Sequence, residues 1–188
     1  MKVAITGGIG SGKSYICQRL ELKGIHVYDC DAAAKRLMRT SPALQSQLSS
    51  LVGTSVFKEG ILQKGVLAGF LLADEAHKQA VNEVVHPFVA ADFLQSGYEW
   101  LESAIYFESR FDLRVDMDKV LCVAAPKDIR MQRVMKRDGI TRARALEWID
   151  RQMPQEEVCR LSDYIIVNDG IAEVEEQIET VLSHLRIE

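Results

Sequence analysis

The fold is decided by the stretch Gly7-Gly8-Ile9-Gly10-Ser11-Gly12-Lys13-Ser14 near the start of this 188-residue chain. It matches the pattern G-x-x-x-x-G-K-[ST] at every position. Residues 1–6 before it are β-prone, and residues 15–20 after it have the pattern of the first turns of a helix. A strand, a glycine-rich loop and a helix in this order are typical of the phosphate-binding loop, or P-loop. The sequence therefore predicts a three-layer α/β/α core that binds a nucleoside triphosphate.

The residue types of the P-loop suit the phosphates of ATP. Glycines let the backbone wrap a phosphate with its N–H groups inward, and the helix N-terminus adds partial positive charge. Lys13 is expected to reach the β- and γ-phosphates, and Ser14 to ligate Mg²⁺. The predicted ATP-binding residues are Gly8, Ile9, Gly10, Ser11, Gly12, Lys13, Ser14 and Tyr15.

The composition is that of an ordinary globular protein, with 47% hydrophobic and 27% charged residues. A net charge of -4 argues against a general nucleic-acid binder. No apolar run approaches a membrane span and no export segment is recognisable, so we expect a cytoplasmic protein without membrane partners. The cysteines lack C-x-x-C pairs and metal spacing, which favours reduced thiols. They are Cys17, Cys30, Cys122 and Cys159.

Five short apolar stretches are predicted to be buried strands of one parallel sheet. Helical patterns fill most of the gaps between them, which is the α/β signature. Ligands of such sheets gather at the carboxyl ends of the strands. The expected strands are Val3–Thr6, Ile25–Tyr28, Ala104–Phe107, Val120–Ala124 and Tyr164–Val167.

Two helical segments interrupt this pattern. Residues 36–99 are too long for a simple crossover helix and are expected to form a substrate-side subdomain, with Ser41, Asp74 and His86-Pro87 marking helix ends. Residues 127–155 are expected to form a lid over the phosphates, with Thr141 capping its second helix. Eight Lys or Arg and four Asp or Glu lie within residues 127–151, although a solvated basic face is the alternative.

Carboxylates follow the expected second and third strands. In an extended Asp29-Cys30-Asp31 segment both carboxylates share one side, and either is a candidate for taking the proton of an attacking hydroxyl or placing Mg²⁺. The alternative for Asp31 is a helix N-cap. Glu108 is a candidate for a metal or substrate contact, or a solvated strand end. His86 is a candidate phosphate ligand, or a surface residue.

Taken together, these features resemble the dephospho-coenzyme A kinase family along nearly the whole chain. The extended P-loop from Thr6 to Ser14 is similar to the family's own, and residues 29–35 resemble its D-A-D-x-x-A-R segment. His86-Pro87 and Phe107-Glu108 resemble its histidine-proline pair and its third-strand ending. Arg137-Asp138, Arg151-Gln152 and residues 162–168 resemble its lid residues and its closing strand.

The resemblance implies ATP-dependent phosphorylation of the ribose 3′-hydroxyl of dephospho-CoA, with Mg²⁺. It implies strand order 2-3-1-4-5, a core of residues 1–35 and 100–188, a CoA-binding insertion at 36–99 and a lid at 127–155. Dephospho-CoA and ATP are the expected partners, for a monomer or small homo-oligomer. The expected catalytic residues are Asp31, Lys13, Arg137 and Arg142; the substrate-binding ones are Asp29, Lys35, His86 and Glu108; the metal ligand is Ser14, with Asp31 as a second candidate.

Some positions depart from the family pattern, and rival functions follow from the same core. Cys30, Lys35, Ala104, Tyr15 and Val158 replace more usual residues. The first rival is another small-molecule P-loop kinase. The second is a nucleotide-dependent switch. The chain has no guanine-selective N-K-x-D sequence, which argues against this function. The third is a fold that binds nucleotide without turnover, against which the intact P-loop and Asp31 argue.

Overall fold

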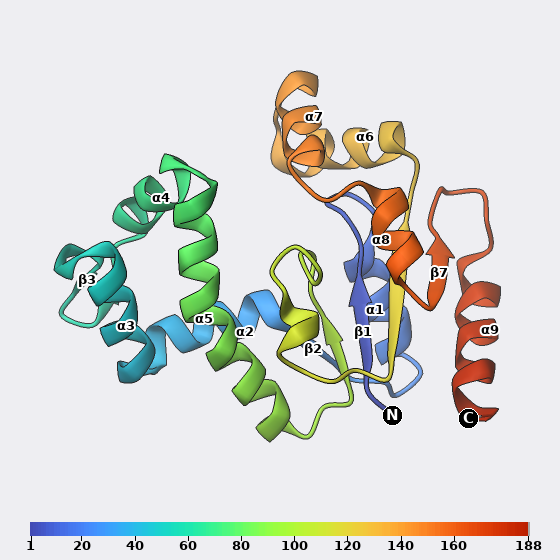
Figure 1. Ribbon diagram of the computed structural model, residues 1–188. Helices are drawn as coiled ribbons and strands as arrows, with labels where there is room; N and C mark the ends of the chain where they lie inside the picture. The colour runs from blue at the N-terminus through green and yellow to red at the C-terminus, as the bar shows by residue number, and fades with distance from the viewer. Residues whose placement is uncertain (188) are drawn as a thin grey trace. The chain divides into compact units, whose positions relative to one another are not determined.

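The computed structural model describes residues 1–187, which fold into an α/β architecture (Figure 1). The strands are β1 Val3–Thr6, β2 Val27–Asp29, β3 Phe57–Lys58, β4 Ile61–Leu62, β5 Trp100–Glu102, β6 Lys119–Ala124 and β7 Tyr164–Val167. The helices are α1 Lys13–Glu21, α2 Cys30–Thr40, α3 Pro42–Val52, α4 Lys64–Ala73, α5 Glu75–Ser96, α6 Lys127–Asp138, α7 Arg142–Asp150, α8 Gln155–Leu161 and α9 Val174–Ile187. Short 3₁₀ turns occupy Thr54–Val56 and Phe111–Leu113.

The chain divides into two compact units. The first, the nucleotide unit, comprises Met1–Tyr28, Tyr98–Asp112 and residues from Asp116 onward. The second, the helical unit, comprises Asp29–Gly97 and Leu113–Val115. The helical unit therefore contains Asp29, Asp31 and Lys35 in addition to most of residues 36–99.

A five-stranded sheet has the order β2-β5-β1-β6-β7. Because β3 and β4 form a separate hairpin, these are the second, third, first, fourth and fifth strands of the sheet in chain order, as expected. β1 pairs in parallel with both β5 and β6, and β6 pairs in parallel with β7. The predicted α/β class is confirmed.

The core of the nucleotide unit follows the alternation of side chains along the strands. Val3 and Ile5 of β1 lie in the cluster that also holds residues of α1 and α9. Cys122 and Ala124 of β6 lie in a different cluster, which includes Val158 of α8. Because neighbouring residues of a strand point to opposite faces, helices cover both faces of the sheet. Val158, one of the positions that depart from the family pattern, is buried in this cluster, where an apolar side chain is suitable.

The predicted third strand at Ala104–Phe107 is wrong. β5 lies at Trp100–Glu102, where it pairs with β1, and residues 104–110 form turns. In these turns Ser109 N–H donates to the Ile105 carbonyl, and Phe111 N–H donates to the Tyr106 carbonyl. The apolar side chains of Tyr106 and Phe111 are buried as strand residues would be, so burial alone produced the misleading pattern.

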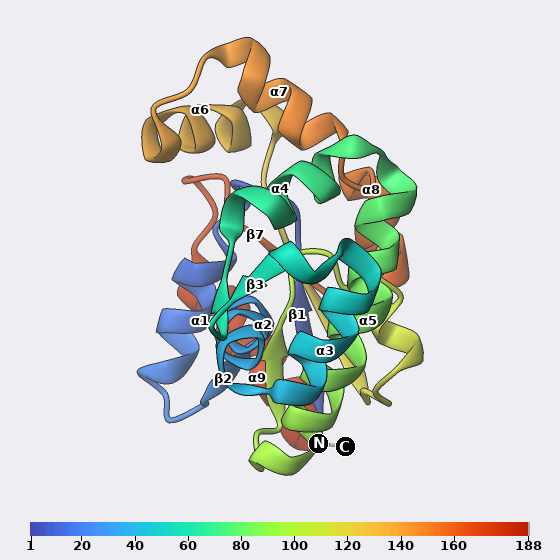
Figure 2. The same cartoon turned by 90° about the vertical axis from the view of Figure 1, so that its left-hand side faces the viewer.

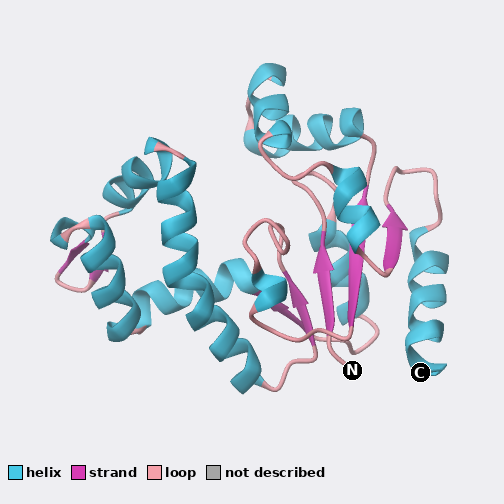
Figure 3. Ribbon diagram, viewed as in Figure 1, coloured by secondary structure: helices cyan, strands magenta, loops and turns pink. Residues whose placement is uncertain are grey.

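Within the helical unit, α5 contacts α2, α3 and α4, and β4 of the β3–β4 hairpin, the short pair of strands visible in Figure 3, contacts α2. The expected cap at Ser41 is confirmed, because Ser41 accepts from Leu44 N–H. The helix expected to begin at Asp74 is α5, which Asp74 caps by accepting from His77 N–H. The expected helix end at His86-Pro87 is wrong. α5 continues through Pro87, and the buried face that includes Val89 and Phe93 compensates for the lost hydrogen bond.

Helices α6 and α7 lie together beyond one end of β1 and β6, as Figures 1 and 2 both show. Thr141 caps α7 by accepting from Arg144 N–H, as predicted. Met131 and Val134 of α6 pack against Ala145 and Ile149 of α7. Within residues 1–187, none of the helices combines the length and apolarity that crossing a membrane requires.

Candidate active site

The P-loop leaves the start of α1 open to an anion. Gly12 is the N-cap residue, with a left-handed φ of 93°, and it provides no side chain to cap the helix. The first N–H groups of a helix lack intrahelical acceptors. Neither the Gly10 N–H nor the Gly12 N–H donates to any group within residues 1–187. The loop therefore presents main-chain donors to phosphate oxygens.

Lys13 lies buried inside the P-loop. Its Nζ donates to the Gly7 carbonyl over 2.7 Å and lies 3.6 Å from Glu102 Oε1. Glu102 is the last residue of β5, so the carboxylate at the end of this strand is Glu102 and not Glu108. The ammonium group is thus held at the loop with a single nearby carboxylate side chain, among the described residues, to balance it.

The hydroxyl groups of the P-loop are available for ligands. The Ser11 hydroxyl is fully buried and lacks a hydrogen-bond partner among the described residues. Ser14 is exposed in the first turn of α1 and makes no hydrogen bond of its side chain within residues 1–187. Tyr15 is also exposed, with the guanidinium of Arg19 over its ring.

Two side chains from residues 127–155, the predicted lid segment, form hydrogen bonds with both main-chain polar groups of Ile9. The Ile9 N–H donates to Gln152 Oε1 over 2.6 Å. The Ile9 carbonyl accepts from Arg130 Nε over 3.0 Å. Arg130 belongs to α6 and Gln152 follows α7, so the two ends of the lid segment meet at one residue of the P-loop.

Arg133 and Asn168 hold the next carbonyls of the P-loop. Asn168 Nδ2 donates to the Ser11 carbonyl over 2.9 Å, and Arg133 Nη1 donates to the same oxygen over 3.2 Å. Arg133 Nη1 also lies 3.4 Å from the Gly10 carbonyl. Asn168 directly follows β7, which places it at the end of the sheet where the P-loop lies.

The remaining predicted residues of the nucleotide unit lie in residues 127–155 or contact them. Glu108 lies in a turn, and its Oε1 accepts from Met153 N–H over 2.8 Å, next to Gln152. Arg137 lies in the last turn of α6 beside Asp138, whose carboxylate raises the pKa of this guanidinium through a hydrogen bond. Arg142 is the exposed first residue of α7.

The acidic segment at the start of α2 differs from the prediction. Cys30 begins the helix, so Asp29 and Asp31 do not share one side of an extended strand. Asp29 is the N-cap and accepts from Ala32 N–H over 2.8 Å. Asp31, the expected cap in the alternative interpretation, lies in the first turn, exposed and without a hydrogen bond or ion pair within residues 1–187. Asp29 therefore caps the helix, whereas the Asp31 carboxylate makes no such contact in the described residues.

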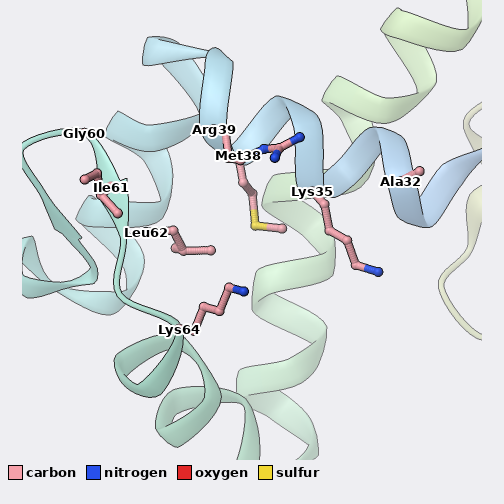
Figure 4. A pocket seen from close by; sticks show the side chains of 8 residues that line it. All are labelled: Ala32, Lys35, Met38, Arg39, Gly60, Ile61, Leu62 and Lys64. Atoms are coloured by element: carbon pink, nitrogen blue, oxygen red, sulfur yellow. The ribbon is translucent and has the colours of Figure 1, made fainter.

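A pocket of about 840 Å³ opens in the helical unit between α2 and the β4–α4 segment. Figure 4 shows Met38, Leu62 and Lys64 directed into this space, with Lys35 at its edge. Neither lysine forms an ion pair with a carboxylate in the described chain. His86 belongs to the same unit but lies in the middle of α5. The lining residues are Ala32, Lys35, Met38, Arg39, Gly60, Ile61, Leu62 and Lys64.

Sequence reasoning missed several residues of the site. Glu102 is not predicted because the apolar pattern places the third strand at residues 104–107, after Glu102. The strand in fact ends at Glu102. Arg130 and Arg133 are recognisable as basic lid residues, yet they contact the P-loop itself. Their spacing of three residues places both on one side of a helix, which is the signal that points to a shared contact.

Comparison with known proteins agrees with this geometry. A family model described as dephospho-CoA kinase matches residues 1–173. The dephospho-CoA kinase of Bacteroides fragilis (strain YCH46) is 40% identical over 177 residues, covering 90% of this chain and 85% of that protein. That of Bacillus cereus (strain ATCC 10987 / NRS 248) is 31% identical over 196 residues, covering 98% and 97%.

Solved structures share the fold. TT1252 from Thermus thermophilus superposes with a TM-score of 0.80 at 30% identity, covering 100% of this chain and 96% of that one. The dephospho-CoA kinase from Campylobacter jejuni has a TM-score of 0.63 at 20% identity, covering 99% and 96%. From the extent of the family match and the relatives' identity, the chain belongs to the dephospho-CoA kinase family.

Proposed function

We propose that this protein transfers the γ-phosphoryl group of ATP to the ribose 3′-hydroxyl of dephospho-CoA, giving CoA and ADP. The observation that carries the proposal is the intact P-loop with buried Lys13 in a chain of this family. In-line phosphoryl transfer needs positioning and charge stabilisation more than covalent chemistry. Free main-chain donors and a buried ammonium group supply both.

The pocket of the helical unit is the proposed site for the rest of the acceptor. Dephospho-CoA carries a diphosphate and a long pantetheine arm, in which amide groups alternate with methyl and methylene groups. Lys35, Arg39 and Lys64 supply cations for the diphosphate, while Met38 and Leu62 supply an apolar surface for the arm. We therefore assign residues 36–99 to acceptor binding, together with Lys35 of α2.

Asp31 is the proposed base for the 3′-hydroxyl. Because Asp29 already caps α2, Asp31 is not required by the helix and keeps its oxygens for a ligand. A positioned general base contributes about 10²- to 10⁴-fold to turnover. Arg137 and Arg142 are the proposed lid arginines for the phosphates, in residues 127–155. The roles of His86 and Glu108 in acceptor binding stay predictions.

Mg²⁺ fits the start of α1. The exposed Ser14 hydroxyl has no protein partner among the described residues, and Mg²⁺ commonly takes one or two protein oxygens beside substrate phosphates. Ser14 would hold the ion there, with Asp31 as the second candidate. When bound, the ion neutralises charge on the β- and γ-phosphates. We propose a cytoplasmic enzyme that acts as a monomer or small homo-oligomer.

The proposed reaction is tested by measuring ADP release from Mg-ATP with dephospho-CoA, adenosine or AMP as acceptor. We expect stimulation by dephospho-CoA alone, with CoA as the product. Stimulation by AMP or adenosine would instead indicate another small-molecule kinase. Turnover without any acceptor dependence would favour a nucleotide switch.

The acceptor pocket is tested by Lys35→Ala and Lys64→Ala. Each is expected to raise KM for dephospho-CoA about 10-fold while KM for ATP stays within about 2-fold, because a charge-assisted contact is lost on one substrate only. Lys78→Ala is the matched control, since Lys78 is a partly exposed lysine of the same unit, paired with Glu75. Equal effects on both KM values would remove the pocket from acceptor binding.

The role of Asp31 is tested by Asp31→Asn. This change keeps the size of the side chain and is expected to lower kcat about 10²-fold or more with ATP binding unchanged. Normal turnover of this variant would show that Asp31 is not the base.

A further inference from the structure

Arg130 is a buried cation of the segment that the sequence analysis predicts to be a lid. The residue is only 4% exposed, and burial lowers the pKa of its guanidinium. No carboxylate of the described chain forms an ion pair with it. Asp150 and Glu156 line the same small pocket as Arg130, but Asp150 pairs with Lys127 instead. An unpaired buried guanidinium costs several kcal/mol, so its position calls for a function.

The guanidinium lies directly against the P-loop. Its Nε donates to the Ile9 carbonyl over 3.0 Å. A Cβ atom on Gly8 would lie 2.1 Å from Arg130 Nη2, so only glycine at this position leaves room for the guanidinium. The P-loop and α6 therefore pack closely where the Arg130 side chain contacts Gly8 and Ile9.

The hydrogen bond from Arg130 to the Ile9 carbonyl also fixes the direction of the Gly10 N–H, which belongs to the same peptide group. The peptide bonds of the described chain are trans, so the Ile9 carbonyl and the Gly10 N–H point in opposite directions. Holding the carbonyl on the Arg130 side turns the Gly10 N–H toward the other side, where it has no acceptor within residues 1–187. A cation on the carbonyl also polarises the peptide and strengthens its N–H as a donor.

We propose that Arg130 is a positioning residue of the kinase reaction, which acts through the Ile9 carbonyl to orient and strengthen the Gly10 N–H as a donor to the nucleotide phosphates. Arg130 itself does not touch ATP. Arg133 and Asn168 hold the Ser11 carbonyl in the same manner and orient the Gly12 N–H. The negative charge of the nucleotide also balances the buried guanidinium across the loop.

This inference rests on the nucleotide-binding part of the proposed function and is independent of the acceptor. The test follows the amide proton shifts of Gly10 and Gly12 by NMR in ¹⁵N-glycine-labelled protein, with and without Mg-ADP. In the unmodified protein both amides are expected to move downfield on binding. In Arg130→Gln the Gly10 response is expected to fall at least 2-fold, with the Gly12 response retained.

Two further variants make the test specific. Arg133→Gln is expected to reduce the Gly12 response and to spare that of Gly10. Arg144→Gln removes a lid arginine that is exposed and paired with Glu147, and is expected to change neither. Arg130→Gln is also expected to lower kcat about 10-fold, with Arg130→Lys recovering part of that loss because an ammonium group can still donate to the carbonyl.

Equal loss of both glycine responses in Arg130→Gln would overturn the inference, because it would indicate general loosening of the loop. Retention of both would overturn it as well. If Arg130→Gln does not fold, Arg130→Lys serves in its place, with a reduced Gly10 response and an unchanged Gly12 response expected. A normal amide pattern in a protein that does not phosphorylate dephospho-CoA would refute the proposed acceptor and leave this inference standing.

Discussion

Replacing Gly10 by alanine tests the fit between the P-loop and α6. Gly10 has a φ of 79°, and a Cβ atom there would lie 2.5 Å from the Arg130 carbonyl oxygen and 2.9 Å from Arg130 Cα. Both are backbone atoms of a helix, so neither can turn away as a side-chain tip does. Alanine therefore has two costs at this position, one from the left-handed φ and one from the collision.

Gly24 provides a matched control, because it has nearly the same φ of 81° and a Cβ atom added to it would meet nothing within 4 Å. Gly24→Ala is expected to cost about 1–2 kcal/mol for the left-handed backbone alone. Gly10→Ala is expected to cost about 1–3 kcal/mol more, the usual range for overpacking. For a chain of this size, each kcal/mol lowers Tm by about 2–4 °C.

The assay compares thermal unfolding of the two variants without nucleotide, and then ADP release with dephospho-CoA. The Gly10→Ala protein is expected to melt roughly 2–12 °C below Gly24→Ala and to lose most of its turnover. Gly24→Ala is expected to keep its turnover, since it lies outside the site. Equal melting temperatures would refute the close approach of α6 to the loop.

Three further predictions concern the helical unit. Asp29→Ala removes the N-cap of α2 and is expected to lower the free energy of unfolding by about 1 kcal/mol, measured by urea denaturation. Glu59→Asn is expected to raise it by about 0.5–1 kcal/mol, because Glu59 has a φ of 52° in the β3–β4 turn and asparagine tolerates that conformation better. Hydrogen bonds from the main-chain N–H of His77, and then from its ring, lower the pKa of Asp74 in the folded protein. The stabilisation by this cap is therefore fully present above the unfolded-state pKa of about 3.9, and it is lost as the pH falls through the lower folded-state pKa. Amide exchange at the start of α5 is expected to rise over that acid range and to become independent of pH in Asp74→Asn, apart from the intrinsic exchange rate.

The parts of the fold that could be predicted from the sequence have strong local signals. The P-loop motif, the caps at Ser41 and Thr141, the helix start at Asp74 and the strand order implied by the family resemblance all agree with the structure. Each cap depends on a side chain and an N–H three residues away, so the sequence contains the whole interaction.

The errors occurred where tertiary contacts decide the conformation. Residues 104–107 are apolar because turns can be buried as well as strands, and periodicity does not separate the two in so short a run. α5 passes through Pro87 because packing of its buried face outweighs the local penalty. The contacts of Arg130 and Gln152 with Ile9 join residues more than 120 positions apart, which no local pattern shows.

The charge around the P-loop explains why these long-range contacts matter. Lys13, Arg130 and Arg133 all bond to carbonyl oxygens of the loop, yet only Lys13 has a carboxylate within ion-pair distance in the described residues. These three cations repel one another in a partly buried place, and the carboxylates other than Glu102 that act on them, Asp150 and Glu156 on Arg130 and Asp169 on Arg133, do so without forming ion pairs. A bound triphosphate adds negative charge beside these cations, so nucleotide binding is expected to stabilise the loop.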